Sequence, residues 1–354
     1  MNKPVAVLKI GGGFLGDYKT VSMHLPEIKK IILEYQKQYK VVLVISALAG
    51  ESRKLKKIAN NLFKEKDLKD KDFILSQGEI FSTQLVSQYL NFCDVSAEAL
   101  IGDKLPIVTN NNFSNADVLE VKTEFIKNCL EKNTIPAVPA FIGKTLKNEI
   151  TTLGFDGSDT SAVAVACALK AKECFLFKDV DGIYTANPRR VEKAKKIDFI
   201  SYEHMFVYAL LGSKGVIHPK AVEKAAQNNL DVTVLPFFKK DNGSLITKND
   251  SSDSKIIGIT YSQEEKHIII SIVGDLQEQA GKKFVELLEK YNIEITATKS
   301  IYPLMNLSFV LKDENKLDKT LSLLHTYCGL DSDKLEKSKI VNIEQTYFDP
   351  VFGG

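Results

Sequence analysis

In the first two-thirds of the chain, short apolar runs alternate with longer stretches in which apolar residues recur every three or four positions. The short runs predict buried strands, and the longer stretches predict amphipathic helices between them. This alternation is typical of an α/β fold with a mostly parallel sheet sandwiched by helices. Strands are predicted at 5–10, 41–46, 106–109, 134–139, 174–179 and 231–236, and helices at 25–39, 75–91, 117–132 and 158–172.

A polar segment at 239–254 interrupts this pattern, and its Asn242-Gly243 pair is a turn signal. The elements predicted beyond it form a βαββαβ order, which is typical of a ferredoxin-like domain. They are a strand at 267–273, a helix at 276–291, strands at 294–302 and 306–312, a helix at 315–327 and a strand at 339–345. The sequence therefore predicts domains at 1–248 and 256–346, with a tail at 347–354.

Composition narrows the classes of function. The 354 residues are 44% hydrophobic, enough for a full core, and 47 basic and 45 acidic residues are interspersed, so no basic surface for nucleic acid is indicated. The five cysteines lack CxxC spacing, which favours reduced thiols over disulfides or a metal site. The N-terminus has no room for a signal peptide, and no apolar run approaches the ~18 residues that cross a bilayer. We expect a cytoplasmic protein without membrane contact.

The first predicted strand ends in Lys9-Ile10, which three glycines follow: Gly11, Gly12 and Gly13. Glycines at this place let backbone N–H groups approach phosphate oxygens, and a lysine can neutralise charge on a transferring phosphoryl group. A glycine run alone also fits a plain tight turn. The interpretation as a phosphate loop therefore depends on the segments that follow.

A second small-residue segment, Gly157 to Thr160, opens an apolar helix. Ser158 and Asp159 can cap the first N–H groups of this helix. The same short loop can also direct free N–H groups at phosphates, while the Asp159 carboxylate orients Lys9 or takes part in organising Mg²⁺. We expect both roles.

A third segment starts where the strand at 174–179 ends, at Asp179, and continues through Tyr184 to Arg189. Open α/β sheets bind ligands at the carboxyl ends of their strands. The alternative is a surface hairpin marked by glycine and proline.

These segments and their order resemble the aspartate kinase branch of the amino acid kinase family, with a C-terminal ACT-like domain. The resemblance implies ATP-dependent and Mg²⁺-dependent phosphorylation of the side-chain carboxylate of L-aspartate, the first step towards lysine, threonine and methionine. It implies that Lys9 and Asp159 are catalytic, with Lys9 stabilising the transition state. The nucleotide contacts that it implies are Gly11, Gly12, Gly13, Ser158, Lys178, Asp179 (ribose or metal), Tyr184 (adenine side), Arg189 (phosphates) and Lys214.

On the acceptor side the resemblance rests on Ser76-Gln77-Gly78-Glu79, on the loop that begins at Ser46 and on the loop 109–116. It implies that Glu79 binds the ammonium group of the amino acid substrate and that Ser46 lies in a substrate loop. Taken alone, Glu79 also fits a first-turn residue that complements the dipole of a helix.

Several positions depart from the family pattern. Gly13-Phe14 replaces the usual Thr-Ser, Asn110 replaces an aspartate, and Phe155 and Asp156 stand where an arginine and a glycine are typical. The arginine would hold a substrate carboxylate with a bidentate fork that a phenyl ring cannot form, and Asp156 would repel a dicarboxylate. Of the three arginines only Arg53 follows an acceptor loop, so it is the candidate replacement.

Three functions stay open: an aspartate kinase with a rearranged acceptor site, a kinase of a different small carboxylate or amino acid, and a catalytically weak regulatory subunit that binds nucleotide. The retained Lys9, Asp159, Asp179 and Lys214 argue against the third. Only one ACT-like unit fits where the family usually has two, so this domain is either an amino-acid effector site or a bare dimerisation module. A homodimer is expected, paired through the strands at 267–273 and 306–312.

Overall fold

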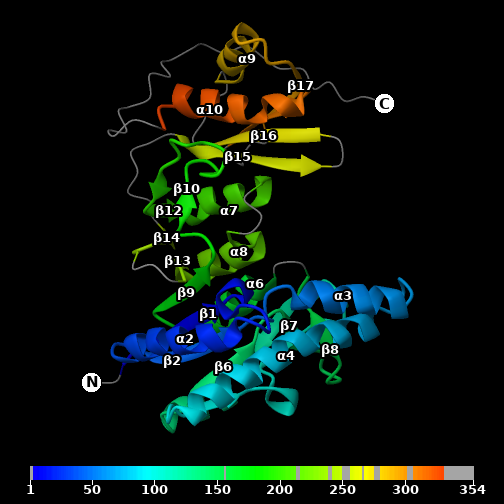
Figure 1. Cartoon of the computed structure of the whole chain (residues 1–354), viewed down its shortest axis with the longest axis vertical. Helices are drawn as coiled ribbons and strands as arrows, with labels where there is room; N and C mark the ends of the chain where they lie inside the picture. The colour runs from blue at the N-terminus through cyan, green and yellow to red at the C-terminus, as the bar shows by residue number, and fades with distance from the viewer. Residues whose placement is uncertain are drawn as a thin grey trace. The chain divides into compact units, whose positions relative to one another are not determined.

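The structure is a computed structural model of the chain, and it describes residues 3–154, 157–212, 216–237, 241–248, 256–264, 267–274, 280–300 and 306–330. The chain divides into two compact units (Figure 1). Buried hydrophobic residues form a separate core cluster in each of them. The first unit is Met1–Gly182 with Gly215–Lys248, and the second is Ile183–Lys214 with Asn249–Gly354. The segment from Ile183 to Lys214 thus groups with the C-terminal part. The domain boundary near residue 250 stays a prediction.

A mostly parallel sheet forms the centre of the first unit, as predicted. Within this unit its strands lie in the order β14-β13-β9-β1-β2-β6-β3, and only β14 runs antiparallel to its neighbour β13. Because β1, β2 and β9 are parallel neighbours, the loops that follow them meet at one edge. The strands are β1 (Val5–Ile10), β2 (Lys40–Ile45), β3 (Ala97–Ala99), β6 (Ile135–Pro139), β9 (Glu173–Lys178), β13 (Asp231–Pro236) and β14 (Ser244–Thr247).

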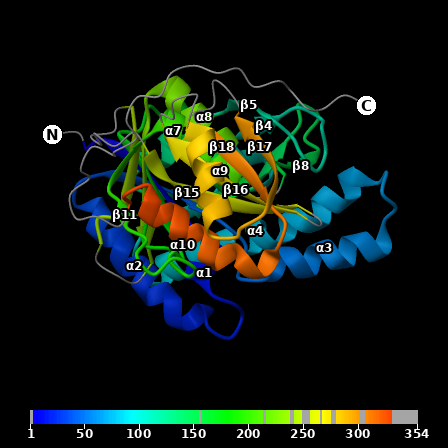
Figure 2. The same cartoon turned by 90° about the horizontal axis from the view of Figure 1, so that it is seen from above.

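Helices pack on both faces of this sheet. Residues of α2 and α4 share one hydrophobic cluster with alternate residues of β1 and β2, while α5, α6 and α8 contact the sheet or one another on the opposite side. In both views α3 and α4 lie side by side (Figures 1 and 2). The helices are α1 (Gly12–Leu15), α2 (Val21–Gln36), α3 (Glu51–Leu62), α4 (Leu68–Phe92), the 3₁₀ turn η1 (Gly102–Lys104), α5 (Glu124–Glu131), α6 (Gly157–Ala168) and α8 (Pro219–Asn228).

A second, smaller sheet of the first unit has the order β5-β4-β7-β8. The predicted strand at 106–109 is β4 of this sheet and not part of the large one. The helix predicted at 117–132 was wrong at its start: residues of β5 pair antiparallel with β4, and α5 begins only at Glu124. Val118 and Val121 lie at the two ends of β5 and are half-buried. Their spacing of three residues also fits one face of a helix, so the prediction began the helix too early. The strands are β4 (Ile107–Thr109), β5 (Val118–Val121), β7 (Ile142–Lys144) and β8 (Ile150–Thr152).

The second unit contains a sheet in the order β15-β16-β18-β17, whose neighbours are all antiparallel. Residues of α9 and α10 share one core with β16 and β18, which confirms the predicted β-α-β-β-α order. The elements of this unit are β10 (Ile183–Tyr184), β11 (Lys196–Ile197), β12 (Phe199–Ser201), α7 (Tyr202–Leu211), β15 (Ile256–Glu264), β16 (His267–Gly274), α9 (Ala280–Lys290), β17 (Ile295–Ser300), β18 (Asn306–Leu311), η2 (Glu314–Lys316) and α10 (Leu317–Tyr327).

One expectation for this unit changes. The strands proposed to pair with a second copy are β16 and β18, and each already has a partner on both sides, so among the strands that the structure describes the edges of this sheet are β15 and β17. The strand predicted at 339–345 and the tail at 347–354 lie outside the described residues. In the part of the chain that the structure describes, no helix combines the length and the apolar character needed to cross a membrane.

Candidate active site

Three charged side chains meet near the carboxyl ends of β1 and β9. Lys9 is the next-to-last residue of β1, Lys178 is the last residue of β9, and Asp159 lies in the first turn of α6. The Nζ of Lys9 is 3.2 Å from Oδ1 of Asp159, and the Nζ of Lys178 is 2.7 Å from Oδ2. All three residues are buried. Asp159 therefore orients both lysines. Both of its carboxylate oxygens pair with ammonium groups, so orienting the lysines is its main role rather than capping α6.

The charges of this cluster govern its ionisation. Burial acts to raise the pKa of Asp159, but the ammonium groups of Lys178 and Lys9 outweigh burial, so the pKa lies below its usual value. The carboxylate is therefore ionised at neutral pH. Two ammonium groups held side by side at the carboxyl edge of a sheet form the kind of site that phosphate oxygens bind.

The glycine loop after β1 lies directly beside this cluster. A Cβ added at Gly12 would come 2.5 Å from the carbonyl oxygen of Ala47, and one added at Gly11 would come 3.5 Å from the Nζ of Lys9. The backbone of this loop is therefore packed against the loop that follows β2, which leaves no room for a side chain at Gly12. Gly13 is exposed, and a Cβ added there would come 3.9 Å from the Cβ of Asp179.

Phe14 explains one departure from the family pattern. The residue is fully buried, and its ring stacks on Phe237 at a centroid distance of 4.8 Å. The position that offers a hydroxyl in the family thus contributes to the hydrophobic core here. Phosphate contacts from this loop are left to backbone N–H groups and to Lys9.

Glu79 lies in the middle of α4 and not in its first turn, because α4 begins at Leu68. The alternative role as a partner of the helix dipole is therefore excluded. Its side chain is buried and points to the start of α3, where the Ser52 hydroxyl lies 3.5 Å from Oε1. Burial raises the pKa of Glu79 to about 8, although backbone hydrogen bonds from Glu79 and Ala47 and the bond from Ser52 act against it.

Several buried polar atoms of the first unit lack a hydrogen-bond partner among the described residues. They include Oγ of Ser46, Oε2 of Glu79 and Oγ1 of Thr160. A buried donor or acceptor without a partner costs roughly 1–3 kcal/mol. These atoms come from the acceptor loop after β2, from α4 and from the first turn of α6, and each is a group that a polar ligand beside it would satisfy.

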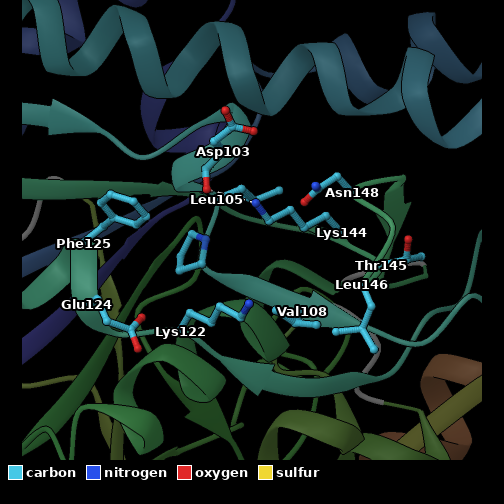
Figure 3. Close-up of a pocket in the computed structure, with 11 residues that line it drawn as sticks. Asp103, Leu105, Val108, Lys122, Glu124, Phe125, Lys144, Thr145, Leu146 and Asn148 are labelled. Carbon is cyan, nitrogen blue, oxygen red and sulfur yellow. Dashed lines mark hydrogen bonds between the residues drawn. The ribbon is translucent and has the colours of Figure 1, made fainter.

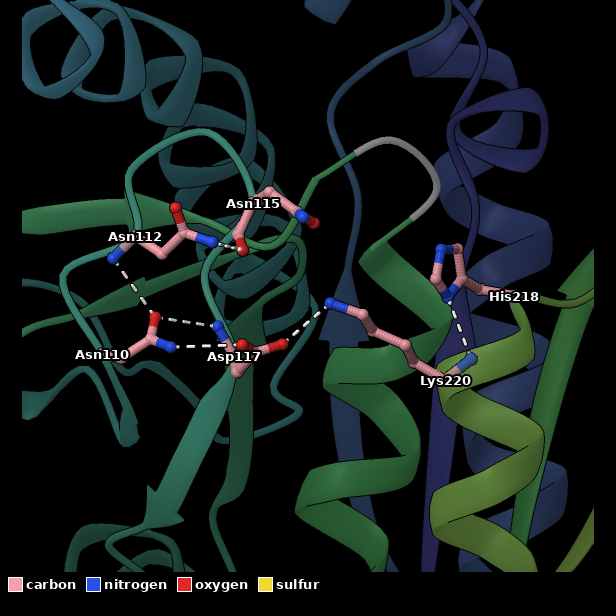
Figure 4. A network of polar contacts seen from close by, with 6 residues as sticks. All are labelled: Asn110, Asn112, Asn115, Asp117, His218 and Lys220. Atoms are coloured by element: carbon pink, nitrogen blue, oxygen red, sulfur yellow. Dashed lines mark hydrogen bonds and ion pairs between the residues drawn. The ribbon is translucent and has the colours of Figure 1, made fainter. Parts of the chain in front are cut away.

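The loop between β4 and β5, predicted on the acceptor side, is fixed by its own polar side chains (Figure 4). The carboxamide oxygen of Asn110 accepts from the backbone N–H groups of Asp117 and Asn112, and its amide donates to Oδ2 of Asp117 at 3.1 Å. Lys220, in the first turn of α8, binds Oδ1 of Asp117 at 2.8 Å. Asn110, where the family has aspartate, therefore closes the loop. His218 caps α8 by accepting from the Lys220 N–H, a structural role.

A surface pocket of about 180 Å³ opens on the small sheet, next to Lys122, Phe125 and Lys144 (Figure 3). Of the described residues that line it, none belongs to the predicted site.

Comparison with known proteins agrees with this arrangement. The amino acid kinase family matches residues 4–236. An aspartokinase of Rickettsia prowazekii is 35% identical over 312 residues, which cover 85% of this chain and 69% of the relative. An aspartokinase of Geobacillus stearothermophilus is 32% identical over 333 residues, which cover 92% of this chain and 80% of the relative.

The chain belongs to the aspartokinases of the amino acid kinase family. The fold agrees as well: the structure of E. coli aspartokinase III in complex with aspartate and ADP matches with a TM-score of 0.79 at 19% identity, covering 91% of this chain and 99% of that one.

The remaining residues that aspartokinase resemblance implied are divided between the units. Ser158 is half-buried in the first turn of α6, and Arg53 is exposed on α3, next to Ser52. Tyr184 lies in β10 and Arg189 is exposed, both in the second unit. Phe155, Asp156 and Lys214 lie outside the described residues.

Sequence reasoning missed two polar residues on the acceptor side, Ser52 and Asp72. Ser52 was detectable as a hydroxyl in the first turn of the helix that follows the Ser46 loop. Asp72 is fully buried and lies seven residues before Glu79 on the same helix. Its signal was an acidic residue in register with the inward face of α4, since a seven-residue spacing returns to nearly the same side of a helix.

Proposed function

We propose that the chain phosphorylates the side-chain carboxylate of L-aspartate with ATP and forms an acyl phosphate. The buried Lys9-Asp159-Lys178 cluster beside the glycine loop carries the proposal. Its two ammonium groups suit a transferring phosphoryl group, whose charge spreads over its oxygens in the transition state. The acceptor carboxylate is already ionised, so the reaction requires no general base. Membership of the aspartokinases supports this choice of acceptor.

The nucleotide is proposed to bind with its phosphates over Gly11, Gly12 and Gly13. Mg²⁺ is proposed to arrive with ATP, because Mg²⁺ retains several waters and binds largely through substrate phosphates. When bound, it neutralises charge on the phosphates. The oxygens of Asp159 are occupied by lysines, so the exposed Asp179 beside Gly13 fits a role as its protein partner.

On the acceptor side, Glu79 is proposed to bind the α-ammonium group of aspartate. The hydroxyl of Ser46, which has no hydrogen-bond partner among the described residues, is proposed to bind a carboxylate of aspartate. Arg53 is proposed to take the role of the arginine that the family typically has at the position of Phe155. The ACT-like region is proposed to hold an amino-acid effector and, through an edge strand of its sheet, to join two copies in a homodimer. The cytoplasm is the proposed location.

A hydroxamate assay tests the proposed reaction directly. With Mg-ATP and a panel of carboxylic amino acids, we expect trapped acyl phosphate with L-aspartate and none with L-glutamate. Signal with another acid but not with aspartate would retain the phosphoryl-transfer site and reassign the acceptor. If no acid gives a signal while ATP still binds, the chain is not a kinase of this class.

The pH dependence of aspartate binding tests the role of Glu79. Burial raises the pKa of Glu79 to about 8, so this carboxyl is mostly protonated at pH 6, and an ammonium group binds its ionised form. At saturating Mg-ATP we expect the KM for aspartate to fall roughly 50-fold between pH 6 and pH 8, because the ionised fraction of Glu79 rises by that factor. Glu79→Gln should raise the KM and remove this pH dependence. A wild-type KM that is flat over this range would contradict the assignment.

A further inference from the structure

Asp72 has an unusual set of hydrogen bonds for a buried carboxylate. Its Oδ2 accepts from the backbone N–H groups of Ser114 and Thr152, both at 2.8 Å. Its Oδ1 accepts from the hydroxyls of the same two residues, at 3.3 Å from Ser114 and 2.8 Å from Thr152. The side chain has no exposed surface. Each oxygen of one carboxylate thus binds two segments that are far apart in sequence.

These two segments both belong to the acceptor side. Ser114 lies in the loop between β4 and β5, and Thr152 ends β8, two residues before Gly154. The carbonyl of Thr152 also accepts from the N–H of Ala116 at 2.9 Å. Gly154 has a φ of +81°, and a Cβ there would come 2.6 Å from Oδ1 of Asn115. The end of β8 and the loop are therefore packed together, with Asp72 beneath both.

The position of Asp72 on α4 relates these segments to Glu79. Seven residues separate Asp72 from Glu79, about 10 Å along the helix axis at 1.5 Å per residue. A rigid helix therefore carries at one point the group proposed to bind the substrate ammonium, and two turns earlier the group that fixes both acceptor segments. No ion pair to Asp72 is present among the described residues, and burial raises its pKa, so its hydrogen-bond geometry and not its charge is the feature to explain.

We propose that Asp72 is a positioning residue for the acceptor: by binding Ser114 and Thr152 from α4, it sets the distance between Glu79 and the residues that follow β8, and so fixes where the acceptor carboxylate lies. The inference rests on the proposed function, because it assigns these segments to acceptor binding. Asp72 itself does not touch the reacting atoms in this assignment.

Two substitutions separate positioning from charge. Asp72→Asn keeps the shape, and its amide can place the oxygen at the two backbone N–H groups and the NH₂ at the two hydroxyls, which are able to turn and accept. Asp72→Ala removes all four bonds. We expect Asp72→Asn to stay within about threefold of wild type in every kinetic constant, and Asp72→Ala to raise the KM for aspartate at least tenfold with the KM for ATP unchanged.

A core variant of the same helix controls for general destabilisation. Leu90 is fully buried in the large core, near the other end of α4. Leu90→Ala should lower the melting temperature at least as much as Asp72→Ala and leave the KM for aspartate within twofold. If Leu90→Ala raises this KM as much as Asp72→Ala does, or if Asp72→Ala affects both substrates equally, a positioning role is overturned.

Hydrogen exchange keeps the inference testable apart from the proposed reaction. In Asp72→Ala, amides of residues 110–117 and 150–154 should exchange at least tenfold faster, while amides of β1 and β9 exchange at the wild-type rate. Unchanged protection of the two segments would overturn the inference whatever the acceptor is. If wild type fails to use aspartate but the two segments lose protection, the proposed function fails and the positioning role of Asp72 stands.

Discussion

Replacing Lys9 by methionine is expected to lower kcat for acyl phosphate formation by about 10²–10³-fold or more, the usual effect of removing a group that stabilises transition-state charge. Methionine retains the aliphatic stem that fills the space beside Gly11, so the buried surroundings stay packed. The ammonium group matters most when negative charge redistributes in the transition state, so the Kd for ATP should change little. Steady-state kinetics and calorimetric titration with ATP, performed on the same preparation, measure the two quantities.

Lys40→Met is the matched control. Lys40 begins β2 and pairs in register with Val5 of β1, at the amino end of the same parallel strands, opposite the glycine loop. This variant should keep the wild-type kcat. A fall in ATP affinity that parallels the fall in kcat in Lys9→Met would instead make Lys9 a general phosphate-binding residue.

The parts of this site that could be predicted from the sequence are those that local patterns encode. A strand that ends in Lys9-Ile10 before three glycines, and an aspartate in the first turn of an apolar helix, reveal their positions within a few residues, and the structure brings Lys9 and Asp159 together. Parallel strands explain this success, since residues at their carboxyl ends meet at one edge whatever their distance in sequence.

The acceptor side could not be predicted in the same way. Ser52 meets Glu79 across 27 residues, and Asp72 meets Ser114 across 42 and Thr152 across 80. No local period encodes these contacts, because they depend on how α3, α4 and the small sheet pack. The start of α4 was also missed, because its first turns are rich in charged residues and lack a clear apolar pattern. The predicted helix began at residue 75, so Glu79 was expected in its first turn and not in the middle of the helix.

The βαββα core of the second unit was predictable for a different reason. Strands β16 and β18 are central and rich in isoleucine, leucine and valine, so their apolar runs are long and clear. Among the strands that the structure describes, the unpredicted β15 pairs in its sheet with β16 alone, and it begins right after a polar segment, so the hydrophobic pattern did not reveal it. Edge strands have fewer apolar constraints than central ones, and sequence patterns identify them less well.

Asp159→Asn is expected to affect stability as well as activity. The substitution leaves the ammonium groups of Lys9 and Lys178 buried side by side without the carboxylate that lies between them. Removing one partner of a buried ion pair costs about 3–5 kcal/mol, because the remaining charge stays desolvated. We expect a loss of this size in the free energy of unfolding, measured by urea denaturation, and acyl phosphate formation below a hundredth of wild type.

A double substitution separates repulsion between the lysines from a simple loss of packing. Lys9→Met in the Asp159→Asn background removes one of the two ammonium groups, so the double variant should be more stable than Asp159→Asn alone, a coupling that a double-mutant cycle measures. Mg-ATP should raise the melting temperature of Asp159→Asn more than that of wild type, since its phosphates supply negative charge next to both lysines. If the two substitutions add without coupling, Asp159 serves the packing of α6 and not the charge balance of the lysines.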